Sequence, residues 1–343
     1  MKKYEQLYNS LRESITNGSL PNGSRLPTEA DFVKQTGFSR QTVRQALEML
    51  ENESLIVKKH GSGSFVSAET AKTRTMRIAV ISRYFNYYFF PSMIEGIEEA
   101  ASSHDYSIVL HASHNNVEQE RNILCHILDD NIDGILVEGC RTALPNPNLS
   151  IYRDLLSKGM PVVFFNSYYK ELFEKPYDNC GFVSMDDENA SYELTSSLIS
   201  LGHSKIGAVM KFDELCGHNR YAGYLRALTE YEVPVTDSSV VWFGNRNTDD
   251  VVSVLDKYDI FTKFTAIVCY NDRTAMQLID ELKKRETTIT AVGSFDGIPN
   301  IVPEDLQFIS KEMPSKQIGS IATENLINII NGRKADCILL PVK

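Results

Sequence analysis

Apolar residues recur at helical spacing three times within the first 50 residues of the chain. In the first segment they lie three or four positions apart and stop at Asn17-Gly18. In the second, Thr28 begins the pattern as an N-cap and Gly37 ends it. In the third, Ser39 caps a helix whose apolar side faces inward. The predicted helices cover residues 4–16, 28–36 and 40–50.

Two short strand patterns follow the third helix. Residues 55–59 and 64–66 are joined by the segment His60-Gly61-Ser62-Gly63, which we interpret as the tip of a hairpin. Because this segment joins two strands rather than a strand and a helix, it does not fit a phosphate-binding glycine loop. Three helices followed by a hairpin predict a winged helix-turn-helix, which places one helix in the major groove of DNA.

A polar segment without periodicity, residues 67–76, is predicted to be a linker. Beyond it, eight apolar runs alternate with helical patterns in two series of four, which indicates parallel strands covered by helices on both faces. We therefore predict an α/β protein, with a winged helix-turn-helix at residues 1–66 and a two-lobed, periplasmic-binding-protein-like domain of doubly wound parallel sheets at residues 77–343. Such sheets bind ligands at the carboxyl ends of their strands. The runs are residues 78–82, 107–112, 133–138, 161–166, 205–210, 240–243, 265–270 and 290–295.

The net charge of −10 is unevenly distributed along the chain. Residues 1–77 contain 12 Lys and Arg against 8 Asp and Glu, so they carry +4 and the remainder carries −14. Affinity for DNA depends on the charge near the phosphates rather than on the total. The distribution therefore permits DNA binding by the first domain.

Targeting signals and cysteine spacing narrow the class of protein further. No apolar run reaches the roughly 18 residues needed to span a bilayer, and the N-terminus lacks the apolar segment of a secretion signal. The six cysteines are scattered, without paired spacing or a pattern of metal ligands. We expect a cytoplasmic protein with reduced thiols, no metal and no cofactor.

The first 66 residues resemble the GntR family of winged-helix regulators, through PTEADFVKQTGFSRQTVRQALEMLENESLI followed by HGSGSFV. From about residue 76 the chain resembles the LacI-type sugar-responsive domain, which is related to periplasmic sugar-binding proteins. Segments such as DGILVE, NRYAGYLRAL, TAIVCYNDRTAMQLIDEL and AVGSFDGIP carry this second resemblance. The combination is similar to the arabinose repressors of Gram-positive bacteria. It implies a dimeric repressor that leaves its operator when a sugar occupies the cleft, with L-arabinose as the expected sugar.

The exposed start of the third helix supplies the leading candidates for DNA contact. Arg40 and Arg44 can each donate two parallel hydrogen bonds to guanine or to a phosphate; the structural alternative is that they are solvated helix charges. An acidic residue at a helix start is favourable by itself, which leaves the role of Glu29 open. Ser39, Gln41 and Thr42 share this face. Glu29, His60 and Gly61 match the GntR family at the second helix and the wing tip, and Lys3 is a candidate for phosphate contact.

Polar residues at the ends of the predicted strands are the candidates for ligand binding. Planar amide, carboxylate and guanidinium groups suit the neighbouring hydroxyls of a sugar, and aromatic faces suit its C–H side. The two phenylalanines below match paired aromatics of related sugar-binding proteins. The candidates are Tyr84, Phe89, Phe90, Glu138, Asn166, Arg220, Asn271 and Asp296, with Arg83 and either Trp242 or Phe243 as additions.

Some of these residues also have a structural interpretation. Asp272 is expected to cap the helix that follows it, and Asp296 with Gly297 could form a turn. Phe89 and Phe90 could belong to the core. The family has a glutamine before its final crossover helix, where this chain has Glu312-Met313-Pro314.

The leading hypothesis is a sequence-specific repressor of carbohydrate utilisation genes. It would bind double-stranded operator DNA as a homodimer and be released by a small sugar. One alternative is a regulator that responds to another pentose, a hexose or a sugar phosphate. Another is a sugar-binding transport component, which the DNA-binding segment opposes. An enzyme is not expected, because the candidate cleft residues include no activated nucleophile or acid–base pair.

Overall fold

The computed structural model of the chain describes residues 2–16, 19–21, 23–59, 62–67, 74–129, 131–175, 177–244, 251–258, 260–298 and 302–342. They form two compact units, Met1–Thr75 and Met76–Lys343, which we call the head and the body. Among these residues, no helix combines the length and the apolar character that crossing a membrane requires.

The head contains the three predicted helices and the two predicted wing strands. They are α1 (Lys3–Thr16), α2 (Glu29–Thr36), α3 (Arg40–Asn52), β1 (Ile56–Lys59) and β2 (Gly63–Val66), with β1 and β2 antiparallel. Thr28 and Asp31 form a reciprocal capping box at the start of α2. Gly37 ends α2 with a φ of +67°, a left-handed conformation that costs glycine little, and so sets the turn into α3.

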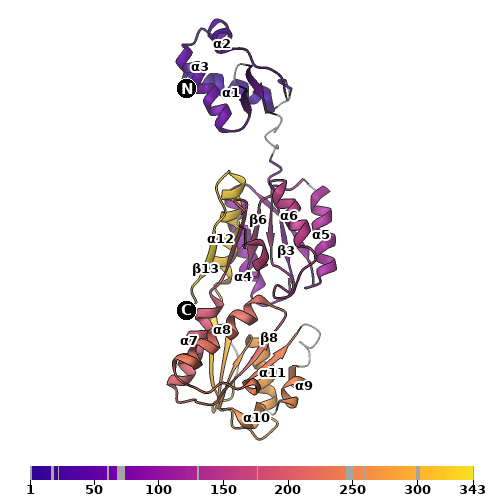
Figure 1. Cartoon of the computed structure of the whole chain (residues 1–343), viewed down its shortest axis with the longest axis vertical. Coiled ribbons are helices and arrows are strands. Elements are labelled where there is room, and N and C mark those ends of the chain that lie inside the picture. The colour runs from indigo at the N-terminus through magenta and orange to yellow at the C-terminus, as the bar shows by residue number, and fades with distance from the viewer. Residues whose placement is uncertain are drawn as a thin grey trace. The chain divides into compact units, whose positions relative to one another are not determined.

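The first lobe of the body is built on a six-stranded parallel sheet in the order β13-β7-β6-β5-β3-β4. Its chain runs through residues 77–185 and returns for the last helix and strand, which lie beside β6 in Figure 1. The strands are β3 (Arg77–Ser82), β4 (Ser107–Ala112), β5 (Gly134–Val137), β6 (Val162–Phe165), β7 (Cys180–Met185) and β13 (Cys337–Leu340), and the helices are α4 (Phe90–Ser103), α5 (Val117–Asp129), α6 (Leu149–Ser157) and α12 (Ser315–Ile330).

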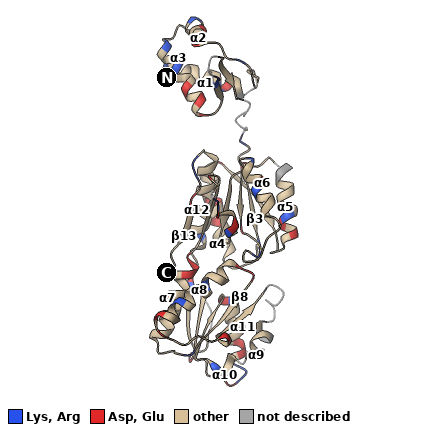
Figure 2. Cartoon of the chain, in the orientation of Figure 1, with Lys and Arg blue, Asp and Glu red and all other residues tan. Residues whose placement is uncertain are grey.

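The second lobe is built on a five-stranded parallel sheet in the order β12-β11-β10-β8-β9. Its strands are β8 (Ile206–Lys211), β9 (Val240–Phe243), β10 (Ala266–Cys269), β11 (Ala291–Asp296) and β12 (Gln307–Glu312), and its helices are α7 (Asp187–Ser200), α8 (Leu215–Glu230), α9 (Val251–Lys257), α10 (Ile260–Lys263) and α11 (Asp272–Leu282). Charged residues lie mainly on helices and loops, whereas the strands of both lobes are almost wholly uncharged (Figure 2). This distribution fits sheets covered on both faces.

The prediction of two doubly wound lobes is confirmed, and all eight predicted strands are present. Three further strands, β7, β12 and β13, were not predicted. Gly181 and Ser184 interrupt the apolar run of β7, although most of that strand is buried. β12 and β13 are edge strands, so their side chains are only partly buried and their sequences lack a continuous apolar run.

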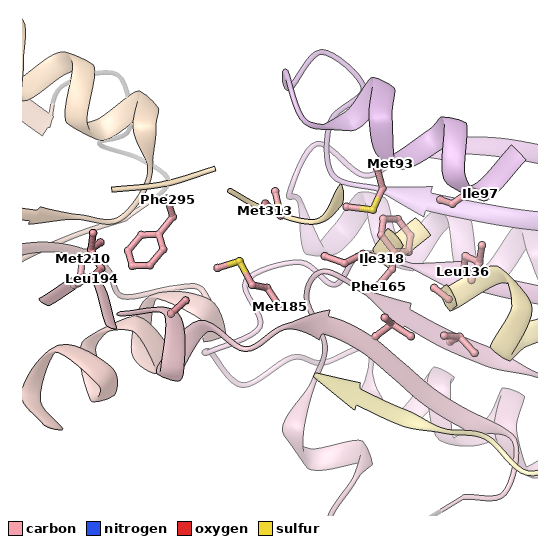
Figure 3. Close-up of a cluster of buried hydrophobic side chains, with 14 of the residues drawn as sticks. Met93, Ile97, Leu136, Phe165, Met185, Leu194, Met210, Phe295, Met313 and Ile318 are labelled. Atoms are coloured by element: carbon pink, nitrogen blue, oxygen red, sulfur yellow. The ribbon is translucent and has the colours of Figure 1, made fainter. Parts of the chain in front are cut away.

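The chain passes between the lobes after β7 and again after β12. Buried methionines lie at both passages, Met185 at the end of β7 and Met313 before α12. Figure 3 shows them between the apolar residues of the two lobes, which include Phe165 on one side and Phe295 on the other. One apolar cluster therefore extends from lobe to lobe through the connecting segments.

Glycine permits close helix packing in each lobe. A Cβ at Gly96 of α4 would lie 2.1 Å from the Lys316 carbonyl oxygen of α12. A Cβ at Gly223 of α8 would lie 1.9 Å from the Glu188 carbonyl oxygen of α7. Backbone atoms are the obstacles in both cases, so any larger residue must separate the two helices.

We expect Gly223→Ala to lower the free energy of unfolding of the second lobe by about 3 kcal/mol, because overpacking a tight contact forces the helices apart. Trp242 is the only tryptophan of the chain and lies on β9, so its fluorescence during urea unfolding reports on this lobe. Ala222→Ser, on the exposed side of α8, is the matched control and should change the free energy by less than about 0.5 kcal/mol. Equal stabilities of the two variants would contradict the packing argument.

Candidate functional site

Helix α3 of the head presents a polar face to solvent. Ser39 caps its N-terminus, where the Ser39 Oγ accepts the Thr42 backbone N–H at 3.2 Å. The apolar side of α3 is buried in the core of the head, which turns the opposite side outward. That outward side lines a shallow hollow made by Arg40, Gln41, Arg44, Gln45 and Glu48.

Glu29, at the start of α2, joins the two arginines of this face. Its Oε2 accepts from Arg40 Nε at 3.2 Å and its Oε1 accepts from Arg44 Nε at 3.3 Å. Partial burial raises the pKa of Glu29, but the hydrogen bonds and charges of the two arginines outweigh it and hold the pKa below its ordinary value. Arg40 and Arg44 remain 75% and 60% exposed, so both guanidinium groups are accessible.

The wing and the N-terminus add further cations to the head. Lys3 Nζ lies 5.8 Å from the centre of the Phe38 ring, in the turn that precedes α3. Lys59 Nζ lies 5.1 Å from the centre of the Phe65 ring on the neighbouring wing strand. His60 and Gly61 lie outside the described residues. A groove between the start of α2 and the wing is lined by Leu26, Pro27, Thr28, Glu29, Leu47, Lys58, Lys59, Gly63 and Ser64.

In the body, a cleft lies where the carboxyl ends of the strands of the two lobes meet. It encloses about 570 Å³ of empty space, including its opening. Its walls combine aromatic rings with amide, guanidinium and ammonium groups. They are formed by Arg83, Tyr84, Tyr87, Tyr88, Phe89 and Asn115 of the first lobe and Lys211, Phe243, Tyr270, Asn271, Arg273, Thr274 and Gln277 of the second.

Arg83, directly after β3, is held between one carboxylate of each lobe. Its Nη2 donates to Glu138 Oε1 at 2.7 Å, and its Nη1 donates to Glu214 Oε2 at 2.5 Å. Burial raises the pKa of both glutamates, but the charge of Arg83 outweighs it and holds both pKa values below the ordinary range. Both carboxylates are therefore ionised at neutral pH, and Arg83 is fixed in place.

Lys211, at the end of β8, is paired in the same way. Its Nζ donates to Glu214 Oε1 at 3.0 Å and lies 3.7 Å from Asp213 Oδ1. Burial lowers the pKa of Lys211, but the charges of Glu214 and Asp213 outweigh it and raise the pKa above its ordinary value. Of the three cations in the walls of the cleft, Arg83 and Lys211 therefore have their charges compensated by neighbouring carboxylates, and Arg273 is the third.

Asn166 and Arg220 lie behind the walls of the cleft. Asn166 Nδ2 donates to Glu138 Oε1 at 2.7 Å. Arg220 donates to Asp187 Oδ1 at 2.7 Å and to the carbonyl oxygen of Tyr270, and its guanidinium lies 4.3 Å from the centre of the Phe295 ring. Arg220 is buried, and its position is determined by these contacts.

Asp296, at the end of β11, contacts the opposite lobe. Its Oδ2 accepts a hydrogen bond from the hydroxyl of Tyr88, which belongs to the loop after β3. Burial raises the pKa of Asp296 to about 7, although the charge of Arg220 and the Tyr88 hydrogen bond oppose this. The backbone of Asp296 has a φ of +112°, which is unusual for a residue with a side chain and indicates a constrained turn into Gly297.

The predicted cap of α11 was wrong by one residue. Asn271 is the N-cap, since its Oδ1 accepts the Thr274 backbone N–H at 3.0 Å. Asp272 is buried and instead accepts from the Ile298 backbone N–H at 2.7 Å and from Ser310 Oγ at 2.7 Å. It therefore ties α11 to the segment after β11 and to β12.

Comparison with known protein families identifies the two units. Residues 75–343 match the family described as periplasmic binding proteins and sugar binding domain of the LacI family. The chain belongs to this family. Residues 3–66 match the bacterial regulatory proteins of the gntR family. The protein is therefore a DNA-binding transcriptional regulator whose body is a LacI-type sugar-binding domain.

Two relatives share nearly the whole length of this LacI-type regulator. An arabinose metabolism transcriptional repressor of Halalkalibacterium halodurans is 30% identical over 97% of the chain and 91% of the relative. A protein of the same name from Geobacillus stearothermophilus is 30% identical over 98% of the chain and 93% of the relative. The solved structure of the complex of the transcriptional regulator CelR with cellobiose has the same fold, with a TM-score of 0.66 and 16% identity over 93% of the chain and 98% of that structure.

The predicted effector residues lie in three environments of the LacI-type body: in the cleft wall, behind or beside that wall, and buried away from it. Phe90 begins α4 and is buried against the ring of Phe85, away from the cleft. Trp242 packs on Tyr221 of α8, whereas its neighbour Phe243 lines the cleft. Of the eight candidates, Tyr84, Phe89 and Asn271 line the cleft, and Glu138, Asn166, Arg220 and Asp296 lie behind or beside it.

Sequence reasoning missed several residues of the cleft wall. Lys211 is the last residue of β8, and Tyr270 directly follows β10. The search for residues at strand ends, which selected Asn166 and Asp296, could therefore have found both. Asn115 follows β4 by the same rule. No sequence signal distinguished Glu214, because its role depends on contacts with residues of the other lobe.

We expect Asp187→Ala to lower the free energy of unfolding by about 3–5 kcal/mol, because it leaves the buried guanidinium of Arg220 without its counter-ion. Urea unfolding followed by Trp242 fluorescence measures the effect. Glu188→Ala removes the side chain of the next residue, whose ion pair with Arg226 is solvent-exposed. It should lower the free energy of unfolding by less than about 1 kcal/mol. The argument is wrong if the two substitutions cost the same.

Proposed function

We propose that the protein is a homodimeric repressor of carbohydrate utilisation genes that L-arabinose releases from its operator. The observation that carries the proposal is the cleft of the body, where Arg83 and Lys211 are already paired with carboxylates. These two side chains offer oriented hydrogen bonds while their charges are already compensated, which suits a neutral polyhydroxylated ligand. The names of the two full-length relatives support arabinose as that ligand.

In the head, we propose that Arg40 and Arg44 contact the bases or phosphates of the major groove. A guanidinium can exchange a partly exposed carboxylate such as that of Glu29 for the O6 and N7 of guanine, because both partners are planar acceptors. Ser39, Gln41 and Thr42 belong to the same turn of α3 and complete this contact face. Lys3 supplies phosphate contact, and His60 with Gly61 enters the minor groove at the wing tip.

In the body, we propose that the sugar lies between the ring faces of the first lobe and the polar groups of the second. Tyr84, Tyr87 and Phe89 supply apolar surface for the C–H side of the ring. Asn271 and Lys211 supply donors for its hydroxyls. Asn166, Arg220 and Asp296 complete the site when the lobes change their angle around a bound sugar. The sugar is bound and released unchanged.

Release of DNA requires that the sugar favour one state of the body. A ligand shifts an equilibrium only by its difference in affinity for the two states. We propose that the sugar-bound body holds the two heads of the dimer at a separation that does not match adjacent operator half-sites. Operator DNA and sugar therefore bind alternative states of one dimer.

We expect Arg40→Ala and Arg44→Ala each to weaken operator binding by about 5- to 150-fold, which corresponds to about 1–3 kcal/mol for a bidentate base contact. Fluorescence anisotropy with an operator obtained by in vitro selection measures the affinity at several salt concentrations. Arg12→Ala is the matched control, because Arg12 pairs with Glu53 at the other end of α3 and carries the same charge. Unchanged affinity of the double variant Arg40→Ala/Arg44→Ala would disprove the proposed DNA face.

We expect L-arabinose to lower operator affinity by at least about tenfold, a coupling of about 1.4 kcal/mol. The same anisotropy assay measures it, with D-ribose, D-glucose and a pentose 5-phosphate as comparison ligands. Trp242 fluorescence measures sugar binding without DNA. The proposal fails if L-arabinose changes neither signal, and its ligand is reassigned if another sugar in the panel acts instead.

A further inference from the structure

We infer that Glu214 is a positioning residue that sets the preference of the cleft for neutral sugars and joins the two lobes around them. This inference rests on the proposed sugar response. Glu214 directly precedes α8, is fully buried and does not line the cleft itself. It acts through three donors, all of which do line the cleft.

The three donors come from both lobes. Glu214 Oε2 accepts from Arg83 Nη1 at 2.5 Å, and its Oε1 accepts from Asn115 Nδ2 and Lys211 Nζ, each at 3.0 Å. Arg83 and Asn115 belong to the first lobe, and Lys211 belongs to the second. One carboxylate therefore fixes three side chains in the walls of the cleft relative to one another.

A further contact places the start of α8 against the first lobe. The backbone N–H of Leu215, the residue after Glu214, donates to Thr142 Oγ1 at 3.0 Å. Thr142 lies in the segment after β5, whose Arg141 backbone N–H donates to Asn115 Oδ1 at 3.1 Å. Asn115 is thus held at both ends of its amide, by Arg141 in its own lobe and by Glu214 in the other.

Arg83 retains a donor that Glu214 and Glu138 do not use. Its Nε is buried and has no hydrogen-bond partner among the described residues. A buried N–H without a partner is costly, so a ligand hydroxyl that accepts from it gains affinity. Glu214 and Glu138 fix the orientation of the guanidinium and with it the direction of this N–H.

The charge of Glu214 also determines which ligands the cleft accepts. Two cations of the wall, Arg83 and Lys211, are paired with Glu138 and Glu214, and Asp213 lies beside Lys211. A phosphorylated sugar would bring a dianion to a site where the charges of Arg83 and Lys211 are already compensated. Removing the charge of Glu214 raises the net charge of this cluster by one unit and should favour the anionic ligand.

The test measures the affinities of the full-length protein for L-arabinose and for a pentose 5-phosphate by Trp242 fluorescence and calorimetry. We expect Glu214→Gln to weaken L-arabinose binding by about tenfold or more, since charged hydrogen bonds to three wall residues are lost. We also expect it to raise the ratio of phosphate-sugar affinity to arabinose affinity by about tenfold. Glu214→Asp keeps the charge and should retain the wild-type ratio. Glu193→Gln, which removes an exposed pair with Lys311, is the control for a general charge effect.

The outcomes separate this inference from the proposed function. If the wild-type protein binds no sugar, the proposed function fails. If it binds L-arabinose, and Glu214→Gln either keeps its affinity or loses affinity for both ligands equally, Glu214 has at most a structural role and the inference is overturned. Should Glu214→Gln not fold, the double variant Lys211→Gln/Glu214→Gln replaces it. That variant removes one charge of each sign, so it should bind L-arabinose weakly with the wild-type ratio, and wild-type affinity would overturn the inference.

Discussion

Parallel strands direct the carboxyl ends of both sheets toward one cleft, and the rest of the body depends on that arrangement. In each sheet, successive strands are added first on one side of the starting strand, β3 or β8, and then on the other side. Arg83 and Lys211 lie at the ends of these two strands. Charges at such depth are stable only when they are paired and hydrogen-bonded. Glu138 and Glu214 meet this requirement for Arg83 and Lys211.

The two passages of the chain between the lobes limit how the cleft can open. Met185 and Met313 belong to a cluster that continues into the cores of both lobes, so these segments remain packed while the angle between the lobes changes. We expect a change of this angle to alter the exposed contact across the cleft between Tyr88 and Asp296 before the buried pair of Glu214 with Arg83. The Tyr88–Asp296 contact is therefore the one that we expect a ligand to strengthen or replace.

The elements of this fold were largely predictable, because apolar runs and caps are local features of the sequence. Strand-end positions correctly directed attention to Asn271 and Tyr84 as residues of the cleft. What could not be predicted were pairings between distant segments, such as Glu214 with Arg83, 131 residues apart. The direction of a side chain on a strand was equally inaccessible, so the sequence left Trp242 and Phe243 as alternatives, of which Phe243 lines the cleft. The edge strands β12 and β13 were not predicted, because their partial burial leaves no continuous apolar run in the sequence.

Head and body use the same chemical pair, arginine with glutamate, under opposite conditions of exposure. In the head, Glu29 holds Arg40 and Arg44 at a surface where water screens the interaction, so a phosphate or a guanine can take its place at little cost. In the body, Glu214 and Arg83 are buried, and separating them would leave two unpaired charges. We therefore propose that DNA is bound by exchange of partners, whereas a sugar is bound by groups whose partners stay in place. This difference suits a regulator whose DNA contact must be reversible and whose ligand site must discriminate between similar small molecules.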